Sequence, residues 1–143
     1  MRRLVQMTVA ASVAVVMSSV AACGGSSSSP SVTTNPTLVN DVFNGVVQVG
    51  GTNVSNFTVT TPGTLSITLT STSPQTTLFM GLGVGTPNGS GGCTYIQTTQ
   101  GQASTTTAQL SGSVTASGQY CVAIGDVGNA AGPITYSITV SHT

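Results

Sequence analysis

Three residues of this chain have side chains suited to acid–base chemistry: Asp41, Asp126 and His142. A hydrolytic triad needs a nucleophile, a base and an orienting acid within hydrogen-bonding reach of one another. His142 is one residue from the end of the chain, where chains fray, and Asp41 lies at the end of a predicted linker. No Gly-x-Ser-x-Gly motif marks any of the many serines as a nucleophile. We therefore predict that the protein has no catalytic residue and is not an enzyme.

Two further patterns bear on cofactors and metals. The glycines of Gly81-Leu82-Gly83-Val84-Gly85 are spaced as in a phosphate loop, but no lysine follows them. A strand that runs into a hairpin is the favoured interpretation. Asp126 and Asn129, with nearby carbonyls, offer oxygen ligands, yet calcium takes about 6–8 oxygens, several of them from carboxylates. We expect Asp126 to cap a turn instead, and we expect no metal and no cofactor.

The remaining reactive residues are three cysteines, Cys23, Cys93 and Cys121. Cys23 follows Val20-Ala21-Ala22, and this stretch is similar to the lipobox of bacterial lipoproteins. The resemblance implies that a diacylglyceryl group is attached to Cys23 and that the chain is cut between Ala22 and Cys23. It also implies that the new amino terminus is usually acylated. Two or more acyl chains anchor a protein stably in a membrane, whereas one does so only marginally.

Residues 1–22 have the layout of the signal peptide that such a cleavage requires. Arg2 and Arg3 precede a mostly apolar run, and small residues come before the cysteine. The alternative is a transmembrane anchor, which needs about 20 mainly apolar residues, a length that this run barely reaches. We expect a lipid-anchored protein of the bacterial envelope, with its domain in the periplasm or at the cell surface. Gly24, in place of an aspartate, favours the outer membrane if the cell is Gram-negative.

Cys93 and Cys121 are the pair that remains if Cys23 is lipidated. The envelope is oxidising, so a disulfide between them can persist. It would stabilise the fold by roughly 3.5 kcal/mol in the chain-entropy model. The alternative is two separate buried thiols. Cys121 has the opposite parity to Tyr120 and Val122, so the bridge is expected on an outer face rather than in the core.

The charge of the chain excludes one class of partner. Both basic residues, Arg2 and Arg3, lie in the predicted signal peptide, and the chain has no lysine and no glutamate. After cleavage the formal charge would be −2, from two aspartates and no cation. A chain without basic residues cannot neutralise phosphates, so we predict no nucleic-acid binding. Its solubility must come from serine and threonine, which make up 40 of residues 23–143.

The chain divides into a tether and a domain. Residues 23–42 are predicted to form a flexible linker, because residues 24–37 are dominated by Gly, Ser, Thr and Pro. As a random coil, residues 24–37 would have their ends about 20 Å apart. Residues 43–143 show alternation with a period of two, most clearly at Leu65, Ile67 and Leu69. About eight such segments are separated by Gly, Pro and Asn turns, with no helical period. The pattern predicts an all-β domain, an antiparallel β-sandwich or barrel.

The order of these segments resembles the bacterial pre-peptidase C-terminal (PPC) domain, a β-sandwich with jelly-roll character. The resemblance is carried by residues 45–59, 62–69, 117–124 and 132–140. It implies a domain appended to exported proteins. The family often has acidic residues before two of its strands, where this chain has Asn53, Ser55, Thr76 and Thr77. Some relatives bind calcium through acidic residues, so the resemblance does not carry calcium binding over to this chain.

Two functions remain open from the sequence. The leading one is a non-enzymatic interaction or structural module of the envelope, with an envelope protein or a polysaccharide as its partner. The alternative is a carbohydrate-binding module, for which an exposed aromatic side chain is the usual platform. Tyr120 and Tyr136 are in phase with the core, so Tyr95 is the candidate, with Gln97 in the same phase and Asn88 nearby. The competing interpretation of Tyr95 is an edge residue packed on the disulfide.

Overall fold

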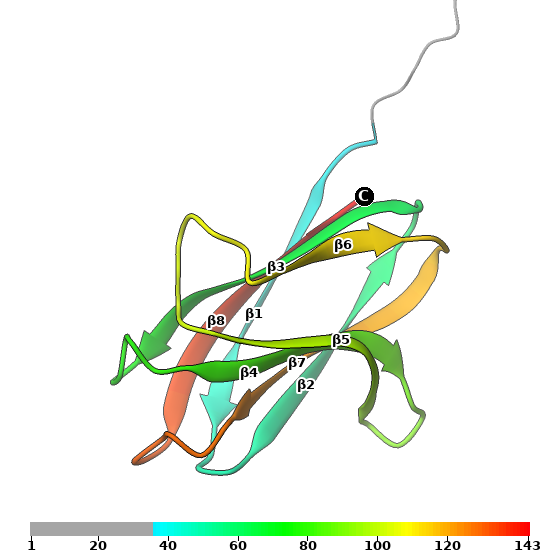
Figure 1. The fold of residues 1–143 in the computed structure, drawn as a ribbon. Helices are drawn as coiled ribbons and strands as arrows, with labels where there is room; N and C mark the ends of the chain where they lie inside the picture. Colours follow the sequence, from blue (N-terminus) through cyan, green and yellow to red (C-terminus); the bar gives the residue numbers. More distant parts are fainter. Residues whose placement is uncertain (1–35) are drawn as a thin grey trace, which may run out of the picture. The chain divides into compact units, whose positions relative to one another are not determined.

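The computed structural model describes residues 36–143, in which the strands and their connections form a domain without helices (Figure 1). The predicted signal peptide, the lipobox with Cys23 and most of the predicted linker lie outside the described residues. In residues 36–143, accordingly, there is no helix long and apolar enough to cross a membrane. The strands are β1 (Val39–Val47), β2 (Thr52–Val59), β3 (Gly63–Ser73), β4 (Met80–Pro87), β5 (Cys93–Gly101), β6 (Leu110–Val114), β7 (Gly118–Asp126) and β8 (Ile134–His142).

Each strand pairs antiparallel with the strand that mirrors it in chain order. β1 pairs with β8, β2 with β7, β3 with β6, and β4 with β5. Two further pairings, β3 with β8 and β4 with β7, join these into four-stranded sheets ordered β1-β8-β3-β6 and β2-β7-β4-β5. This is the strand order of a jelly roll, in which one long antiparallel ribbon wraps into two sheets. The predicted all-β antiparallel sandwich of about eight strands is confirmed.

The core lies between the two sheets and follows the predicted alternation. On β3, Ile67 and Leu69 are fully buried and Leu65 nearly so, while Ser66 and Thr68 on the opposite face are only partly buried. This is what a strand with one face on the core requires, because successive side chains point to opposite faces. The inward positions of the other strands complete the core: Val47, Phe57, Val59, Met80, Leu82, Val84, Leu110, Val114, Val122, Ile124, Ile134, Tyr136, Ile138 and Val140.

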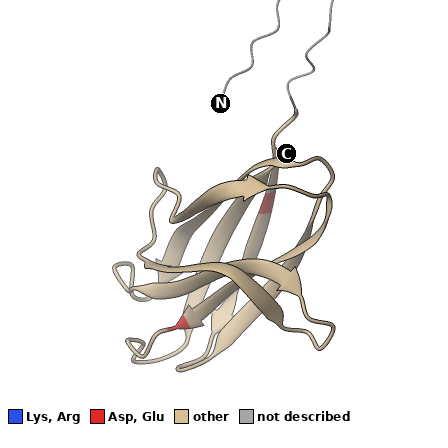
Figure 2. Ribbon diagram, turned by 45° about the vertical axis from the view of Figure 1, so that its right-hand side comes forward, with Lys and Arg blue, Asp and Glu red and all other residues tan. Residues whose placement is uncertain are grey.

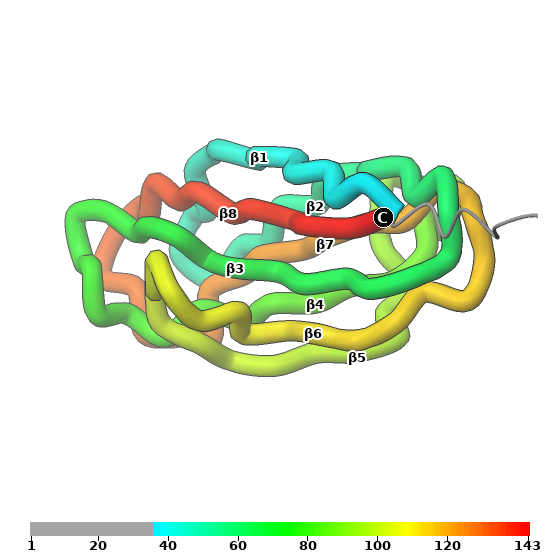
Figure 3. The backbone as a smooth tube through the Cα atoms, turned by 90° about the horizontal axis from the view of Figure 1, so that it is seen from above, coloured from blue at the N-terminus to red at the C-terminus, as the bar shows by residue number. Residues whose placement is uncertain are grey.

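The two long sides of the sandwich differ. On one side β1 and β2 are joined by a tight turn, in which Gly51 N–H donates to the carbonyl of Gln48 at 2.8 Å. On the other side β5 and β6 run next to each other as the last strands of their sheets, without pairing (Figure 3). β1 and β2 are likewise the last strands of their sheets and do not pair with each other, so no hydrogen-bonded ladder closes the sandwich along either side.

Three expectations about strand ends are corrected. β1 begins at Val39 rather than at Phe43, so Asp41 belongs to a strand and not to the linker. The expected fraying of the C-terminus is wrong, because β8 is hydrogen-bonded between β1 and β3 and His142 is 2% exposed. The weaker alternation of residues 105–114 predicts a strand over that range, but the strand begins only at Leu110.

The segment before β6 is held to β3 by Gln109 instead of by a continuous ladder. Gln109 N–H donates to the carbonyl of Ile67 at 3.0 Å, and its side-chain oxygen accepts from Leu69 N–H at 2.7 Å. The side chain thus takes the place of a backbone carbonyl, which shortens the strand without leaving the Leu69 N–H unpaired.

The predicted disulfide between Cys93 and Cys121 is present, with their Cα atoms 5.9 Å apart. Cys93 opens β5, and Cys121 lies in β7 opposite Gly85 of β4. The bridge therefore passes from β5 to β7 across β4, on the outer face of the sheet as expected. Gly85 makes the crossing possible, since a Cβ at that position would collide with the Thr94 carbonyl.

Candidate functional site

Asp126, one of the acidic residues of the domain, is fully engaged in a turn. Its Oδ2 accepts from Gly50 N–H at 2.8 Å, and its Oδ1 accepts from the backbone N–H groups of Gly128, Asn129 and Ala130 at 2.9–3.1 Å. The hydrogen bond from Gly50, with those of the turn, holds the pKa of Asp126 below its usual value against a smaller opposing effect of burial. The turn-capping interpretation is therefore what the geometry shows, and both oxygens are already used by the protein.

Asp41 and His142 form the second ionisable cluster. His142 Nε2 lies 3.1 Å from Asp41 Oδ2, across the β1–β8 pairing, and the imidazole is buried against the ring of Phe57 at a centroid distance of 5.4 Å. In a triad the second ring nitrogen would face a hydroxyl. Here His142 Nδ1 lies 3.4 Å from the backbone carbonyl oxygen of Thr143 instead.

The two clusters are far apart. Figure 2 shows the aspartates near opposite ends of the sandwich, with no lysine or arginine in the described part of the chain. Asp41 and Asp126 therefore cannot act together as paired carboxylates. Within residues 36–143, no group of three or more His, Cys, Asp or Glu side chains comes together in a way that could hold a metal ion.

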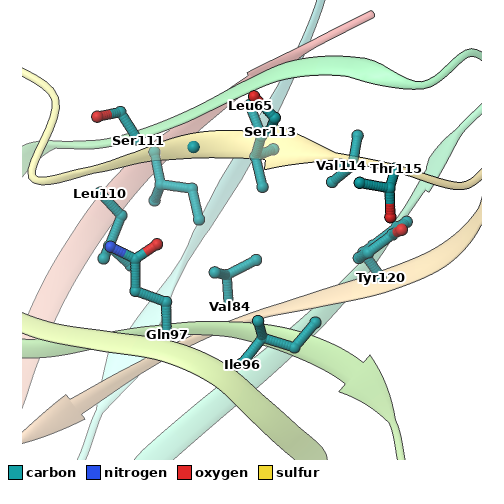
Figure 4. A pocket seen from close by; sticks show the side chains of 12 residues that line it. Leu65, Val84, Ile96, Gln97, Leu110, Ser111, Ser113, Val114, Thr115 and Tyr120 are labelled. Carbon is teal, nitrogen blue, oxygen red and sulfur yellow. The ribbon is translucent and has the colours of Figure 1, made fainter. Parts of the chain in front are cut away.

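A first hollow, the side cleft, opens between β5 and β6 and has a volume of about 170 Å³ (Figure 4). Its floor is apolar and its rim carries hydroxyls and an amide. The lining side chains are Leu65, Ile67, Val84, Ile96, Gln97, Leu110, Ser111, Ser113, Val114, Thr115 and Tyr120. Gly112 lies in the middle of β6 at an inward position, so the core is left uncovered there. A Cβ on Gly112 would meet only Gln97 Oε1, at 3.8 Å.

A second hollow, the outer groove, lies on the outer face of the sheet β2-β7-β4-β5 and has a volume of about 460 Å³. Its bed is the backbone of β4 and β7, where the outward residues are small: Gly81, Gly83, Ala123 and Gly125. Its banks are formed by residues of the flanking strands and of the turn after β7: Thr52, Tyr95, Thr98, Thr99, Gln100, Asp126 and Val127. The Cys93–Cys121 bridge crosses the same face beyond Gly83, opposite Gly85.

The structure separates the three residues predicted to bind sugar. Tyr95 lines the outer groove and is 48% exposed. A β-bulge shifts the register of β5 against β4, because Val84 pairs with Gln97 and Gly85 pairs with Tyr95, leaving Ile96 unpaired. Such a bulge reverses the facing of the residues beyond it, so Gln97 lines the side cleft. The expectation that Gln97 shares the phase of Tyr95 is wrong.

Asn88 has a structural part in the turn between β4 and β5. Its side-chain oxygen accepts from Ser90 N–H at 3.1 Å and from Gly92 N–H at 2.9 Å. This oxygen organises the hairpin that carries Cys93. Asn88 lines neither the outer groove nor the side cleft.

The polar banks of the outer groove were missed in the sequence. Thr98 and Gln100 stand opposite Gly83 and Gly81, and Thr52 stands opposite Gly125. A signal was available, since Gly81, Gly83 and Gly85 alternate with apolar residues along a predicted strand. Glycine at every outward position of a strand leaves that face without side chains, which predicts a trough between the neighbouring strands.

A scan against protein-family models found no match to this chain, and a search of the curated proteins found no similar sequence. The strand order alone places the domain among the eight-stranded jelly-roll sandwiches. Because one fold hosts many functions, the function has to be argued from the sites.

Proposed function

We propose that this protein is a non-enzymatic, lipid-anchored component of the bacterial envelope whose β-sandwich acts as an interaction or structural module. The observation that carries the proposal is the engagement of all three ionisable residues of acid–base type. Asp126 accepts four backbone hydrogen bonds. His142, which pairs with Asp41, is only 2% exposed, and its second ring nitrogen lies against the main-chain oxygen of Thr143. General acid–base catalysis needs such a group free to reach a substrate.

The anchoring part of the proposal rests on the sequence of residues 1–23. The basic start, the apolar run and Val20-Ala21-Ala22-Cys23 together favour lipidation of Cys23. The disulfide is consistent with an oxidising compartment, where such bonds persist. Outer-membrane attachment in a Gram-negative cell, with the domain in the periplasm or at the surface, remains part of the same proposal.

Membership of the PPC family is also kept as a proposal. The sandwich is the fold that this resemblance implies, which supports it. Where the family often has acidic residues, this chain has Asn53, Ser55, Thr76 and Thr77, and some relatives bind calcium through acidic residues. We therefore propose a PPC-like module that does not depend on calcium.

Metabolic labelling with palmitate tests the anchor. We expect the full-length protein to take up the label and to fractionate with membranes, and Cys23→Ser to lose both properties. Cys93→Ser should keep the label, because Cys93 is bonded to Cys121. A labelled Cys23→Ser protein would show that Cys23 is not the site of acylation.

A further inference from the structure

We propose that the outer groove binds an uncharged linear polysaccharide, which lies along β4 and β7 and stacks a sugar ring on Tyr95. This inference rests on the proposed function, since it names the partner of an envelope interaction module. The proposed site differs from the one expected from the sequence. It keeps Tyr95 but does not include Gln97 or Asn88, and it adds Thr52, Thr98 and Gln100.

The groove has the shape of a trough for an extended chain. The facing pairs Gly81–Gly125 and Gly83–Ala123 form its bed, so nothing larger than a methyl group rises from either central strand at these positions. The flanking strands β5 and β2 are three strand spacings apart, or roughly 14 Å. A ligand in this bed lies against backbone at Gly81 and Gly125 and against the Tyr95 ring above Gly83, with side chains on both sides.

Tyr95 supplies the apolar platform. A Cβ at Gly83 would lie 2.8 Å from two ring carbons of Tyr95, so the ring rests directly on the glycine backbone. This packing holds the ring at the groove while 48% of the residue stays exposed. Aromatic side chains with one apolar surface and a polar tip are suited to partners that are themselves part apolar and part hydroxylated.

The banks supply hydrogen-bonding groups of the matching kind. Thr98 and Gln100 on β5 and Thr52 on β2 present hydroxyls and an amide, which can both donate and accept. Sugar hydroxyls have the same dual character. A few well-placed polar groups beside an apolar contact are what orients a ligand in a site of this kind.

Charge selects a neutral ligand. The described chain has no lysine or arginine, so an acidic polymer would find no counter-charge in the groove. The one carboxylate on its lining, Asp126, has both oxygens occupied by backbone N–H groups. A protein partner is less well matched, because interface hot spots are built on large aromatic and arginine anchors, and the groove has a single aromatic side chain.

The test measures binding of the full-length protein, in mild detergent, to a panel of oligosaccharides by titration calorimetry. The panel contains neutral linear hexose oligomers of several linkages and acidic oligomers of the same length. We expect saturable binding to at least one neutral oligomer and none to the acidic ones. Tyr95→Ala should weaken it by about tenfold or more, and Tyr95→Phe should retain most of it because the ring remains.

Phe79→Ala is the matched control, because Phe79 is also 48% exposed but does not line the groove. It should bind as the wild type does. Gly81→Val is a second groove variant that keeps Tyr95. Its added side chain would stand in the bed, where the Cβ would lie 3.1 Å from the end of Val127, so binding should fall.

Three results would overturn the inference. They are no binding to any neutral oligomer, equal binding to acidic ones, and binding that Tyr95→Ala and Gly81→Val leave unchanged. Retention of a protein through Tyr95, with no glycan bound, would also overturn it and would assign the groove to a protein partner. None of these results changes the outcome expected from the palmitate labelling. The proposal of a lipid anchor and the proposal of a glycan site are therefore tested independently.

Discussion

At the scale of single residues, the few ionisable groups of this domain hold the structure together. The Asp126 carboxylate accepts hydrogen bonds both from Gly50, in the turn between β1 and β2, and from the turn after β7. It thereby links the two turns. Asp41 and His142 fasten the ends of β1 and β8 together, although 101 positions separate them in the chain. In a chain with almost no charge, each such contact joins elements that would otherwise meet only through backbone pairs and apolar packing.

The lowered pKa of Asp126 predicts how stability depends on pH. A carboxylate whose pKa is lower in the folded state stabilises the fold above its unfolded pKa of about 3.9, and this contribution is lost as the pH falls through the folded pKa. We expect Asp126→Asn to lower the melting temperature at neutral pH. The difference from the wild type should shrink in strong acid, where the wild-type carboxyl is protonated too.

Thermal unfolding of both proteins, followed by circular dichroism from pH 7 down to about pH 2, measures this. Asn129→Ala serves as a control, because it keeps the backbone N–H that Asp126 binds and should show no such pH dependence. A difference between wild type and Asp126→Asn that stays constant across this range would contradict the prediction.

At the scale of elements, the phase of each strand decides which substitutions matter. Ile67 is fully buried, and its neighbour Thr68 faces outward and is partly buried. We expect Ile67→Ala to lower the free energy of unfolding by about 2–5 kcal/mol, through lost transfer energy and a residual cavity. Thr68→Ala should lower the free energy of unfolding by much less than Ile67→Ala does. Denaturant titration compares the two, and equal losses would mean that the phase of β3 is wrong.

Two strand glycines offer a matched pair with opposite outcomes. A Cβ at Gly112 has open space in the side cleft, whereas a Cβ at Gly85 would collide with the backbone of Thr94. Gly112→Val should therefore raise the free energy of unfolding by about 0.5–2 kcal/mol, by filling a hollow and favouring the strand. Gly85→Ala should destabilise the domain, since a backbone has to shift.

The melting temperatures of the two glycine variants provide the readout. The comparison controls for the general effect of removing a glycine, because both residues lie in strands and neither has a positive φ. Destabilisation by Gly112→Val would mean that the side cleft is already filled by its neighbours.

The inward face of β3 could be predicted from the sequence, whereas the β-bulge in β5 could not. The alternation at Leu65, Ile67 and Leu69 predicted β3 correctly, because side chains of a strand point alternately to its two faces. The bulge between Tyr95 and Gln97 left no comparable signal. It depends on how β5 fits the register of β4, which only the pairing of the two strands defines.

At the scale of the whole molecule, the disulfide joins the tip of the β4–β5 hairpin to β7, which lies on the far side of β4. We expect reduction to lower the free energy of unfolding by about 3.5 kcal/mol, because a loop of this length is no longer closed in the unfolded chain. Denaturant titration with and without a thiol reductant measures the loss. The loosened protein should also associate more readily, since a low net charge promotes association.

Intact mass spectrometry without reduction is the accompanying control, with alkylation of any free thiol. The wild type should take no label at Cys93 or Cys121. The double variant Cys93→Ala/Cys121→Ala should be insensitive to the reductant. Two alkylated thiols in the unreduced wild type would contradict the bridge.

The local properties of this protein follow from its amino-acid sequence. Period-two alternation, punctuated by turn residues, predicts strands and their inward faces, because strand geometry alone fixes which side chains share a face. Counting cysteines predicts the one bridge that forms if Cys23 is lipidated. The lack of any basic residue after Arg3 predicts that nucleic acid is not a partner. These inferences need only the identity of neighbouring residues or a count over the chain.

Contacts between residues on strands that are far apart in the chain could be identified only from the tertiary structure. It made partners of Asp41 and His142, which had been assigned to a linker and a frayed end. It placed Gly81 beside Gly125 and Gly83 beside Ala123, and so made an outer groove whose polar banks come from β2, β5 and the turn after β7. The physical reason is that a local pattern of residues specifies only which face of a strand is buried. Which distant strands become neighbours depends on how the whole core packs.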